Sequence, residues 1–151
     1  KLIAFGALIV GFARAILVVM EQGYIIDTVI FGLSNLISSL PPSLNAVGMY
    51  VTQIIMNFFI PSGSGQAATT MPIMTPLADL LGMERQIAVL AFQYGDAITN
   101  SIIPTSASLM AYLAVAGVPY ERWVKFIWKL VLAWLLIALV AIVVAVAIGV
   151  S

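Results

Sequence analysis

The stretch Pro61-Ser62-Gly63-Ser64-Gly65-Gln66-Ala67-Ala68-Thr69-Thr70-Met71-Pro72 decides the fold of this chain. It lies inside a run from Thr28 to Ala78 that contains no charged residue. About 20 helical residues cross a hydrocarbon core of about 30 Å, and backbone polar groups left unpaired there are strongly destabilising. A run of this length must therefore turn, and residues 61–66, which combine a proline with two glycines, form the predicted tip of that turn.

Composition places the chain in a membrane. Of its 151 residues, 63% are hydrophobic and 8% are charged, whereas soluble domains are about 45–50% apolar and about 25% charged. The formal net charge is zero, so the chain lacks the basic surface that a nucleic acid partner requires, and we expect no such partner. The sequence therefore predicts an all-α integral membrane protein in contact with the lipid bilayer.

The chain contains neither cysteine nor histidine. This composition excludes disulfides, thiolate or imidazole metal sites, and catalysis by Cys-His or Ser-His-Asp groups. An intramembrane aspartyl protease needs two facing aspartates, and Asp96 has no convincing partner because Asp27 and Asp79 lie near predicted interfaces. We therefore expect no enzyme and no cofactor.

We treat residues 1–151 as one transmembrane domain, with two helices before the turn. Residues 1–20 are long enough to cross the membrane, and we expect their one internal charge, Arg14, to reach the interface. Residues 24–40 place apolar side chains on one helical face and polar ones on the other, which is typical of an amphipathic helix. Because no initiator methionine precedes Lys1, we interpret the start as that of a fragment, a processed chain or an engineered boundary.

Two further segments, residues 43–81 and 86–118, carry the interruptions of the apolar pattern. The first is the predicted re-entrant hairpin, because each of its two arms is short for a full span. In the second, the apolar pattern breaks between Gly95 and Ser106 and then resumes, which predicts a discontinuous helix. Irregular backbone at membrane depth needs cover from protein or contact with a wet cavity, so the two interruptions together indicate a transporter.

The last segment, residues 126–149, is predicted to cross the membrane as one helix. Basic residues and tryptophans gather at residues 121–129 and indicate an interfacial anchor without a role in the site. By the positive-inside rule this end is cytoplasmic. The expected location is therefore a plasma membrane, such as the inner membrane of a bacterium, with the C-terminus facing outward.

We predict that the tip of the hairpin and the broken helix meet to form a binding site. A half-helix that begins at the tip directs its amide dipole at an anionic substrate, and neutral oxygens suit a hard cation such as Na⁺. The predicted substrate ligands are Ser62, Gly63, Ser64, Gly65, Gln66, Asn57, Asn100, Thr105 and Ser106. The predicted sodium ligands are Ser64, Gly95, Asp96, Thr99 and Thr105.

These features also have structural interpretations. A cluster of glycine and serine permits close helix packing, Asp96 can fix its own loop through backbone hydrogen bonds, and Asn57 can brace the tip without touching a ligand. Neutral oxygens favour sodium as the coupling ion, whereas the carboxylate of Asp96 leaves coupling to a proton as an alternative. Symport is the form of transport that we expect, with antiport open.

Several longer motifs lie between Gly11 and Val131. They are NFFIPSGSGQ (57–66), MPIMTPLAD (71–79), RQ (85–86), AFQYGD (91–96), TN (99–100), PTS (104–106), LM (109–110) and VPY (118–120). With these motifs the chain resembles the C-terminal half of the C4-dicarboxylate anaerobic carrier family, in its YfcC-like branch, within the ion transporter superfamily.

The resemblance implies an inverted-repeat fold, in which each repeat has a re-entrant hairpin and a broken helix and the transport part moves like an elevator. It also implies that residues 61–66 and 95–106 line one half of the substrate and cation site. This chain holds one such half, so a second copy in a homo-oligomer, or the missing half-repeat, is expected to complete the site. At two positions where the family pattern leads us to expect glycine, the chain has Ala97 and Ala107.

We therefore expect half of a secondary active transporter that moves a small carboxylate or an amino acid with sodium or a proton. One alternative is a transporter-derived assembly module or fragment without transport of its own, which the single repeat and the two alanines favour. The intact tip and Thr99-Asn100 favour transport. A further alternative is a passive channel, whose flux continues without an ion gradient.

Overall fold

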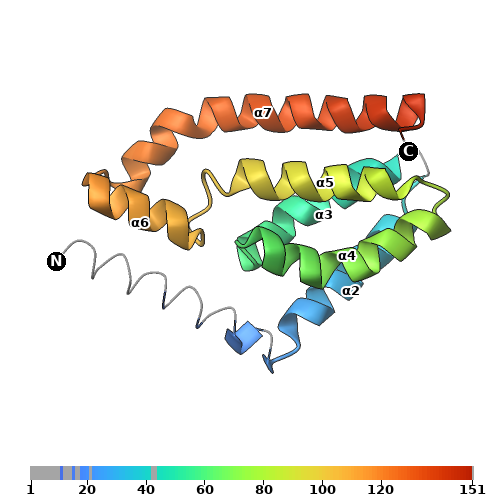
Figure 1. The fold of residues 1–151 in the computed structure, drawn as a ribbon, viewed down its shortest axis with the longest axis horizontal. Coiled ribbons are helices and arrows are strands. Elements are labelled where there is room, and N and C mark those ends of the chain that lie inside the picture. Colours follow the sequence, from blue (N-terminus) through green and yellow to red (C-terminus); the bar gives the residue numbers. More distant parts are fainter. Residues whose placement is uncertain (1–10, 12–14, 16–17, 21, 42–43, 151) are drawn as a thin grey trace.

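A computed structural model of the chain describes residues 11, 15, 18–20, 22–41 and 44–150 (Figure 1). Within these ranges the ordered elements are helices, and no strand occurs. They are α2 (Ile25–Ser38), α3 (Asn45–Phe59), α4 (Gly63–Leu80), α5 (Arg85–Thr99), α6 (Ala107–Ala116) and α7 (Tyr120–Ile148). The predicted membrane helix of residues 1–20, including Arg14, lies almost wholly outside the described residues.

α5 lies at the centre of the packing and contacts α3, α4 and α7 (Figure 1). Its buried face carries the small residues Ala88, Ala91 and Gly95, which allow other helices to approach closely. A Cβ atom on Gly95 would lie 2.8 Å from Gln53 Cβ and 3.2 Å from the backbone nitrogen of Ile54. The backbones of α3 and α5 are therefore in contact at this crossing.

Two clusters of buried apolar side chains hold the helices together. The larger cluster joins α3, α4, α5 and α7, with Ile37 added from α2. The Tyr50 hydroxyl also donates a hydrogen bond of 3.2 Å to the Leu135 carbonyl, which connects α3 to α7. The smaller cluster fixes α2 against the end of α3 through Ile26, Ile30, Met56 and Ile60.

α2 agrees with the predicted amphipathic helix of residues 24–40. Its buried residues are Ile26, Ile30 and Ile37, which lie four and seven residues apart, on one face of a helix. Its other faces are mixed: the Ser38 and Thr28 hydroxyls donate to carbonyls four residues earlier, and the apolar side chains of Phe31 and Leu36 are 68% and 60% exposed. The described residues therefore cover only one face of this helix.

α3 and α4 form a pair of helices with a shorter turn than the predicted tip of residues 61–66. α3 ends at Phe59, and Ser62 is the N-cap of α4, its Oγ accepting a hydrogen bond of 3.4 Å from the Gly65 amide. Residues 63–66 are helical because this cap satisfies an amide that would otherwise lack a partner. α4 then continues through two prolines, Pro72 and Pro76, to Leu80.

α5 and α6 are separated by residues 100–106, so the break begins later than the predicted boundary at Gly95. α5 stays helical through Gly95, and the absence of a side chain there lets α3 touch the helix. Its polar end is satisfied within the fold, since Thr99 Oγ1 donates to the Gly95 carbonyl. α6 begins after the N-cap Ser106, whose Oγ accepts a hydrogen bond of 3.5 Å from the Leu109 amide.

α7 has 29 residues and a mean hydropathy of 3.2 in its most apolar window, and it alone among the described helices is long and apolar enough to cross a membrane. It begins at Tyr120, earlier than the predicted start at residue 126. α7 runs beside α5 in the opposite direction, while α6 lies apart at the end of α5 (Figure 1). Gly117, with a φ of 67°, and Pro119 make the turn between α6 and α7.

Candidate functional site

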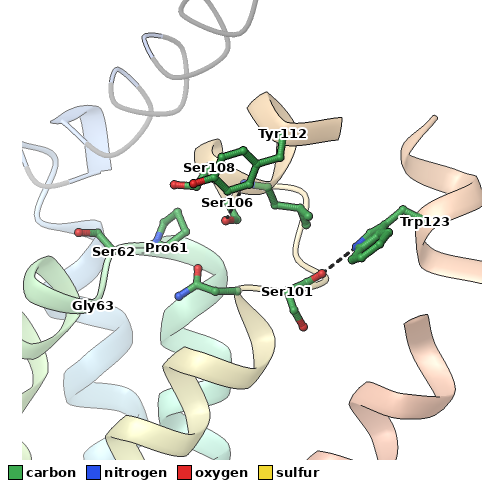
Figure 2. A pocket seen from close by; sticks show the side chains of 10 residues that line it. Pro61, Ser62, Gly63, Ser101, Ser106, Ser108, Tyr112 and Trp123 are labelled. Carbon is green, nitrogen blue, oxygen red and sulfur yellow. Dashed lines mark hydrogen bonds between the residues drawn. The ribbon is translucent and has the colours of Figure 1, made fainter. Parts of the chain in front are cut away.

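A cavity of about 640 Å³ lies where the α3–α4 turn, the α5–α6 break, α6 and the start of α7 meet (Figure 2). Its lining combines hydroxyl, amide and aromatic side chains and includes no charged residue. The lining residues are Pro61, Ser62, Gly63, Asn100, Ser101, Ser106, Ser108, Leu109, Tyr112 and Trp123. The hairpin turn and the break, which are far apart in the sequence, therefore face one cavity.

Two helices begin at this cavity. Ser62 and Ser106 both line it, and they are the N-caps of α4 and α6 respectively. The first amide groups of a helix lack intrahelical acceptors and carry the positive end of the helix dipole. Two helix N-termini at one cavity favour the binding of an anionic group, such as a carboxylate.

One carboxylate lies directly behind the lining. A Cβ atom at Gly63 would lie 3.1 Å from Asp96 Oδ2, so the Asp96 side chain contacts the first turn of α4. Asp96 Oδ1 accepts a hydrogen bond of 2.9 Å from Asn100 Nδ2. Among the described residues the one ion pair joins Asp79 to Arg85, away from the cavity, so no positive side chain is paired with Asp96.

Asn57 joins α3 to the end of α5 and is fully buried. Its Nδ2 donates a hydrogen bond of 2.6 Å to Thr99 Oγ1 and another of 3.1 Å to the Asp96 carbonyl. Asn57 is absent from the cavity lining. Its amide nitrogen therefore braces the last turn of α5.

Gln66 joins α4 to α3 in a similar way. Its Nε2 donates hydrogen bonds of 2.9 Å and 2.7 Å to the backbone carbonyl and to Oε1 of Gln53. Thr70 Oγ1 lies 3.2 Å from the same Gln53 Oε1. Because Gln53, Gln66 and Thr70 are fully buried, these amide and hydroxyl contacts fix the two arms of the hairpin against each other.

Several buried oxygens in this region accept no hydrogen bond from the described residues. They are Asn57 Oδ1, Gln66 Oε1, Asn100 Oδ1 and Thr105 Oγ1. Buried polar atoms are usually paired, so these oxygens remain available to accept a hydrogen bond. Among the residues that the structure describes, no three His, Cys, Asp or Glu side chains gather in a group that could hold a metal ion.

The cavity brings together some of the predicted site residues and not others. Ser62, Gly63, Asn100 and Ser106 line it. Ser64 is exposed outside the lining. The other predicted residues lie behind or beside the lining, namely Asn57, Gly65, Gln66, Gly95, Asp96, Thr99 and Thr105.

The predicted ligands omit six lining residues, of which two fall within the segments 61–66 and 95–106 that the family resemblance implied: they are Pro61 and Ser101, and then Ser108, Leu109, Tyr112 and Trp123. Ser101 and Ser108 lie within two residues of predicted ligands, so the run of hydroxyl and amide side chains could have identified them. Trp123 falls in residues 121–129, which we interpreted as an interfacial anchor alone. Nothing in the sequence pattern indicates that its ring reaches the break.

The chain belongs to the C4-dicarboxylate anaerobic carrier (DcuC) family, whose family model matches residues 1–147. This match confirms the family predicted from the motifs. It places the chain in a class of membrane carriers rather than enzymes.

Two curated relatives are similar to the chain. A protein of Escherichia coli strain K12, provisionally named the basic amino acid antiporter YfcC, is 47% identical over 124 residues, which cover 79% of this chain and 24% of that protein. An uncharacterized protein of Haemophilus influenzae strain Rd is 39% identical over 140 residues, which cover 93% of this chain and 27% of that protein. The chain thus spans about a quarter of the length of these relatives. No solved structure matches it significantly.

Proposed function

We propose that this chain forms one half of the substrate and cation site of a secondary active transporter. The substrate is an amino acid or a small carboxylate, bound in the cavity between the α3–α4 turn and the α5–α6 break. The observation that carries the proposal is the meeting of two helix N-termini, capped by Ser62 and Ser106, at a polar cavity with one carboxylate behind it. Membership of a carrier family supports it.

An amino acid fits this cavity better than a dicarboxylate. The helix N-termini favour one carboxylate of the substrate. A second carboxylate would need a positive side chain, and the lining includes neither lysine nor arginine. Asp96 instead offers a negative partner to an ammonium group or to a coupling cation. The name of the E. coli relative, which refers to basic amino acids, agrees with this preference.

We further propose that the coupling ion is Na⁺ or a proton. The unpaired oxygens of Asn57, Asn100 and Thr105 favour Na⁺ as the coupling ion. If the coupling ion is a proton, Asp96 is the residue that binds it. In this arrangement α3–α4 is a re-entrant hairpin and α5–α6 a discontinuous membrane helix, with residues 121–129 at the cytoplasmic side of a bacterial inner membrane. A second copy of the chain, or the remainder of a longer protein, supplies the other half of the site.

Counterflow in proteoliposomes tests this function. Vesicles that contain the reconstituted chain are loaded with unlabelled arginine, lysine, ornithine, succinate or fumarate, and uptake of the labelled compound is followed with and without sodium and proton gradients. We expect uptake of an amino acid, with Asp96→Asn reducing the rate at least tenfold. Sodium dependence that is retained in Asp96→Asn points to neutral ligands, whereas its loss assigns the cation to the carboxylate.

The substitution Thr28→Ala, at an exposed position on α2, is the matched control and should transport like the wild-type chain. Uptake that persists at full rate without any gradient or internal substrate would identify a passive channel instead. A stably folded wild-type chain that transports none of these compounds would support the assembly-module alternative. Native mass spectrometry of the same preparation tests the pairing of halves, for which we expect an even-numbered oligomer.

A further inference from the structure

The α5–α6 break frees backbone carbonyl groups that face the cavity wall. The carbonyl oxygens of Ser101 and Ile102 accept no backbone hydrogen bond within the described part of the chain. An unpaired carbonyl at membrane depth is strongly destabilising. The break is therefore stable if side chains elsewhere in the protein, or water in the cavity, supply the missing donors.

The first turn of α7 supplies both donors. Trp123 Nε1 donates a hydrogen bond of 2.9 Å to the Ser101 carbonyl, as the dashed line in Figure 2 shows. The Tyr120 hydroxyl donates a hydrogen bond of 2.6 Å to the Ile102 carbonyl. Since residues 120 and 123 are three apart, both side chains project from one face of α7.

These two hydrogen bonds close a loop that contains α6. α6 itself has only two buried residues, Leu109 and Leu113, and it ends at Gly117 in the left-handed conformation. Ser101 at one end of the loop and Trp123 at the other both line the cavity. Without these two hydrogen bonds, little in the described structure would fix the position of α6 and of the break relative to α7.

We infer that Tyr120 and Trp123 are positioning residues that hold the α5–α6 break against α7 and thereby set the shape of the cavity. They act on the break through its carbonyl oxygens. A shift of α7 is transmitted to the cavity wall through these two bonds. The last step of this inference, from the cavity wall to substrate affinity, rests on the proposed function.

A simpler role for both aromatic residues is that of membrane-interface anchors, which Trp and Tyr commonly fill. The hydrogen bonds distinguish the two roles. An interfacial anchor depends on its aromatic ring, which can take many orientations at the membrane surface. A positioning residue depends instead on the one N–H or O–H group that donates to a particular carbonyl. Trp128, on the same helix, is 46% exposed and donates no hydrogen bond to the described residues, so it serves as the anchor for comparison.

Because the sequence contains no cysteine, the accessibility of the break can be measured with a single introduced thiol. Ile103→Cys places a single partly buried thiol within the break, and Leu80→Cys places one at an exposed position at the end of α4. The test adds Tyr120→Phe or Trp123→Phe to each and measures the rate of maleimide labelling in nanodiscs. Both changes keep an aromatic ring and remove the donor; Trp123→Phe also makes the ring system smaller, and the control Trp128→Phe reproduces that loss of size. Matched controls are Tyr24→Phe and Trp128→Phe, at exposed aromatic positions.

We expect each donor-removing change to raise the labelling rate at position 103 about tenfold, the factor that corresponds to about 1.4 kcal/mol for a lost hydrogen bond. The rate at position 80 and the rates in both control variants should stay unchanged. Equal labelling at position 103 in all variants would overturn the inference. A rise in the two control variants as well would assign the effect to general loosening, and would also overturn it.

The consequence for the site is measured separately in the counterflow assay. Tyr120→Phe and Trp123→Phe should raise the apparent KM severalfold while Trp128→Phe leaves it unchanged. Faster labelling without a change in KM would show that the break is held but that the substrate does not depend on it, and would overturn the role in the site. If the wild-type chain transports nothing, the proposed function fails, and the labelling rates still decide whether the two residues hold the break.

Discussion

Gly95 determines how closely two helices approach. It lies on the buried face of α5, where an added Cβ atom would meet both the side chain and the backbone of α3. The nearest atoms are Gln53 Cβ at 2.8 Å and the Gln53 carbonyl carbon at 3.2 Å. Since backbone atoms cannot rotate away as a flexible side chain can, a larger residue must push the helices apart.

Gly95→Ala is therefore expected to destabilise the protein by about 1–3 kcal/mol, as overpacking of a buried contact typically does. Thermal unfolding in detergent, followed by circular dichroism, measures the effect. Gly32→Ala on α2 is the matched control, because a Cβ atom there meets nothing within 4 Å. Alanine is also the better helix former, so Gly32→Ala should be neutral or slightly stabilising. Equal effects of the two changes would contradict the contact.

The ends of the helices show where sequence patterns are informative and where they are not. The serines that cap α4 and α6 are part of the polar stretches that predicted a turn and a break, so the existence of both interruptions followed from the sequence. Their boundaries did not. Glycine and polar residues from 95 to 99 predict the end of a helix, yet α5 continues because α3 occupies the space beside Gly95 and Asn57 satisfies the polar groups.

The connection between α4 and α5 is held by an ion pair at the surface. Arg85 donates hydrogen bonds of 2.9 Å and 2.8 Å from Nε and NH2 to the two oxygens of Asp79. The hydrogen bond from Arg85, together with its charge, lowers the pKa of the Asp79 carboxyl below its ordinary value. Both groups are exposed, so the contribution of the pair to stability is small.

This lowered pKa fixes the direction of a pH dependence. Because the pKa of Asp79 is lower in the folded than in the unfolded protein, the stabilisation is complete above the unfolded value of about 3.9 and disappears as the pH falls through the folded value. Arg85→Gln should lower the unfolding temperature slightly at pH 6, and the difference from wild type should shrink as the pH falls below the unfolded value. Lys125→Gln, at another exposed cation, is the control. A difference that grows toward acid pH would contradict the assignment.

At the scale of the whole molecule, α7 presents a long apolar surface. Leu136, Ile137 and Val140 in its middle are 54%, 65% and 62% exposed. Because the chain belongs to a carrier family and the helix is long and apolar enough to cross a membrane, we propose that this surface faces lipid. Opposite it, Ala138 and Ile142 are buried against the other helices.

Ile137→Lys tests this orientation, because a lysine near the centre of a membrane helix costs about 2.5–3.5 kcal/mol in insertion. We expect a clear loss of the membrane-inserted fraction, measured by alkaline extraction of expressing cells. Phe126→Lys is the matched control, since position 126 is 77% exposed near the start of the helix, between Lys125 and Lys129. There the ammonium group reaches the interface, and insertion should be retained. Loss of insertion in both variants would contradict the predicted depth.

The sequence alone predicted the class of protein, the helical character of the residues that the structure describes, and the turn and the break between helices. These properties depend on local features: apolar composition over the length of a span, charges at its ends, and proline, glycine and capping serines where a helix cannot continue. The motifs likewise predicted the family that the comparison confirms. None of these inferences requires knowledge of which segments touch.

The tertiary structure decided which groups meet. Asn57 hydrogen-bonds to the end of α5, Asp96 contacts Gly63, and Trp123 hydrogen-bonds to the break. The two partners in each of these contacts are at least 20 positions apart in the sequence. A hydrogen bond requires its two atoms to lie within about 3 Å, and packing of the intervening helices sets such distances. The sequence therefore predicted some of the polar groups that line the cavity, namely Ser62, Asn100 and Ser106, and only the packing of the helices brought them to one cavity.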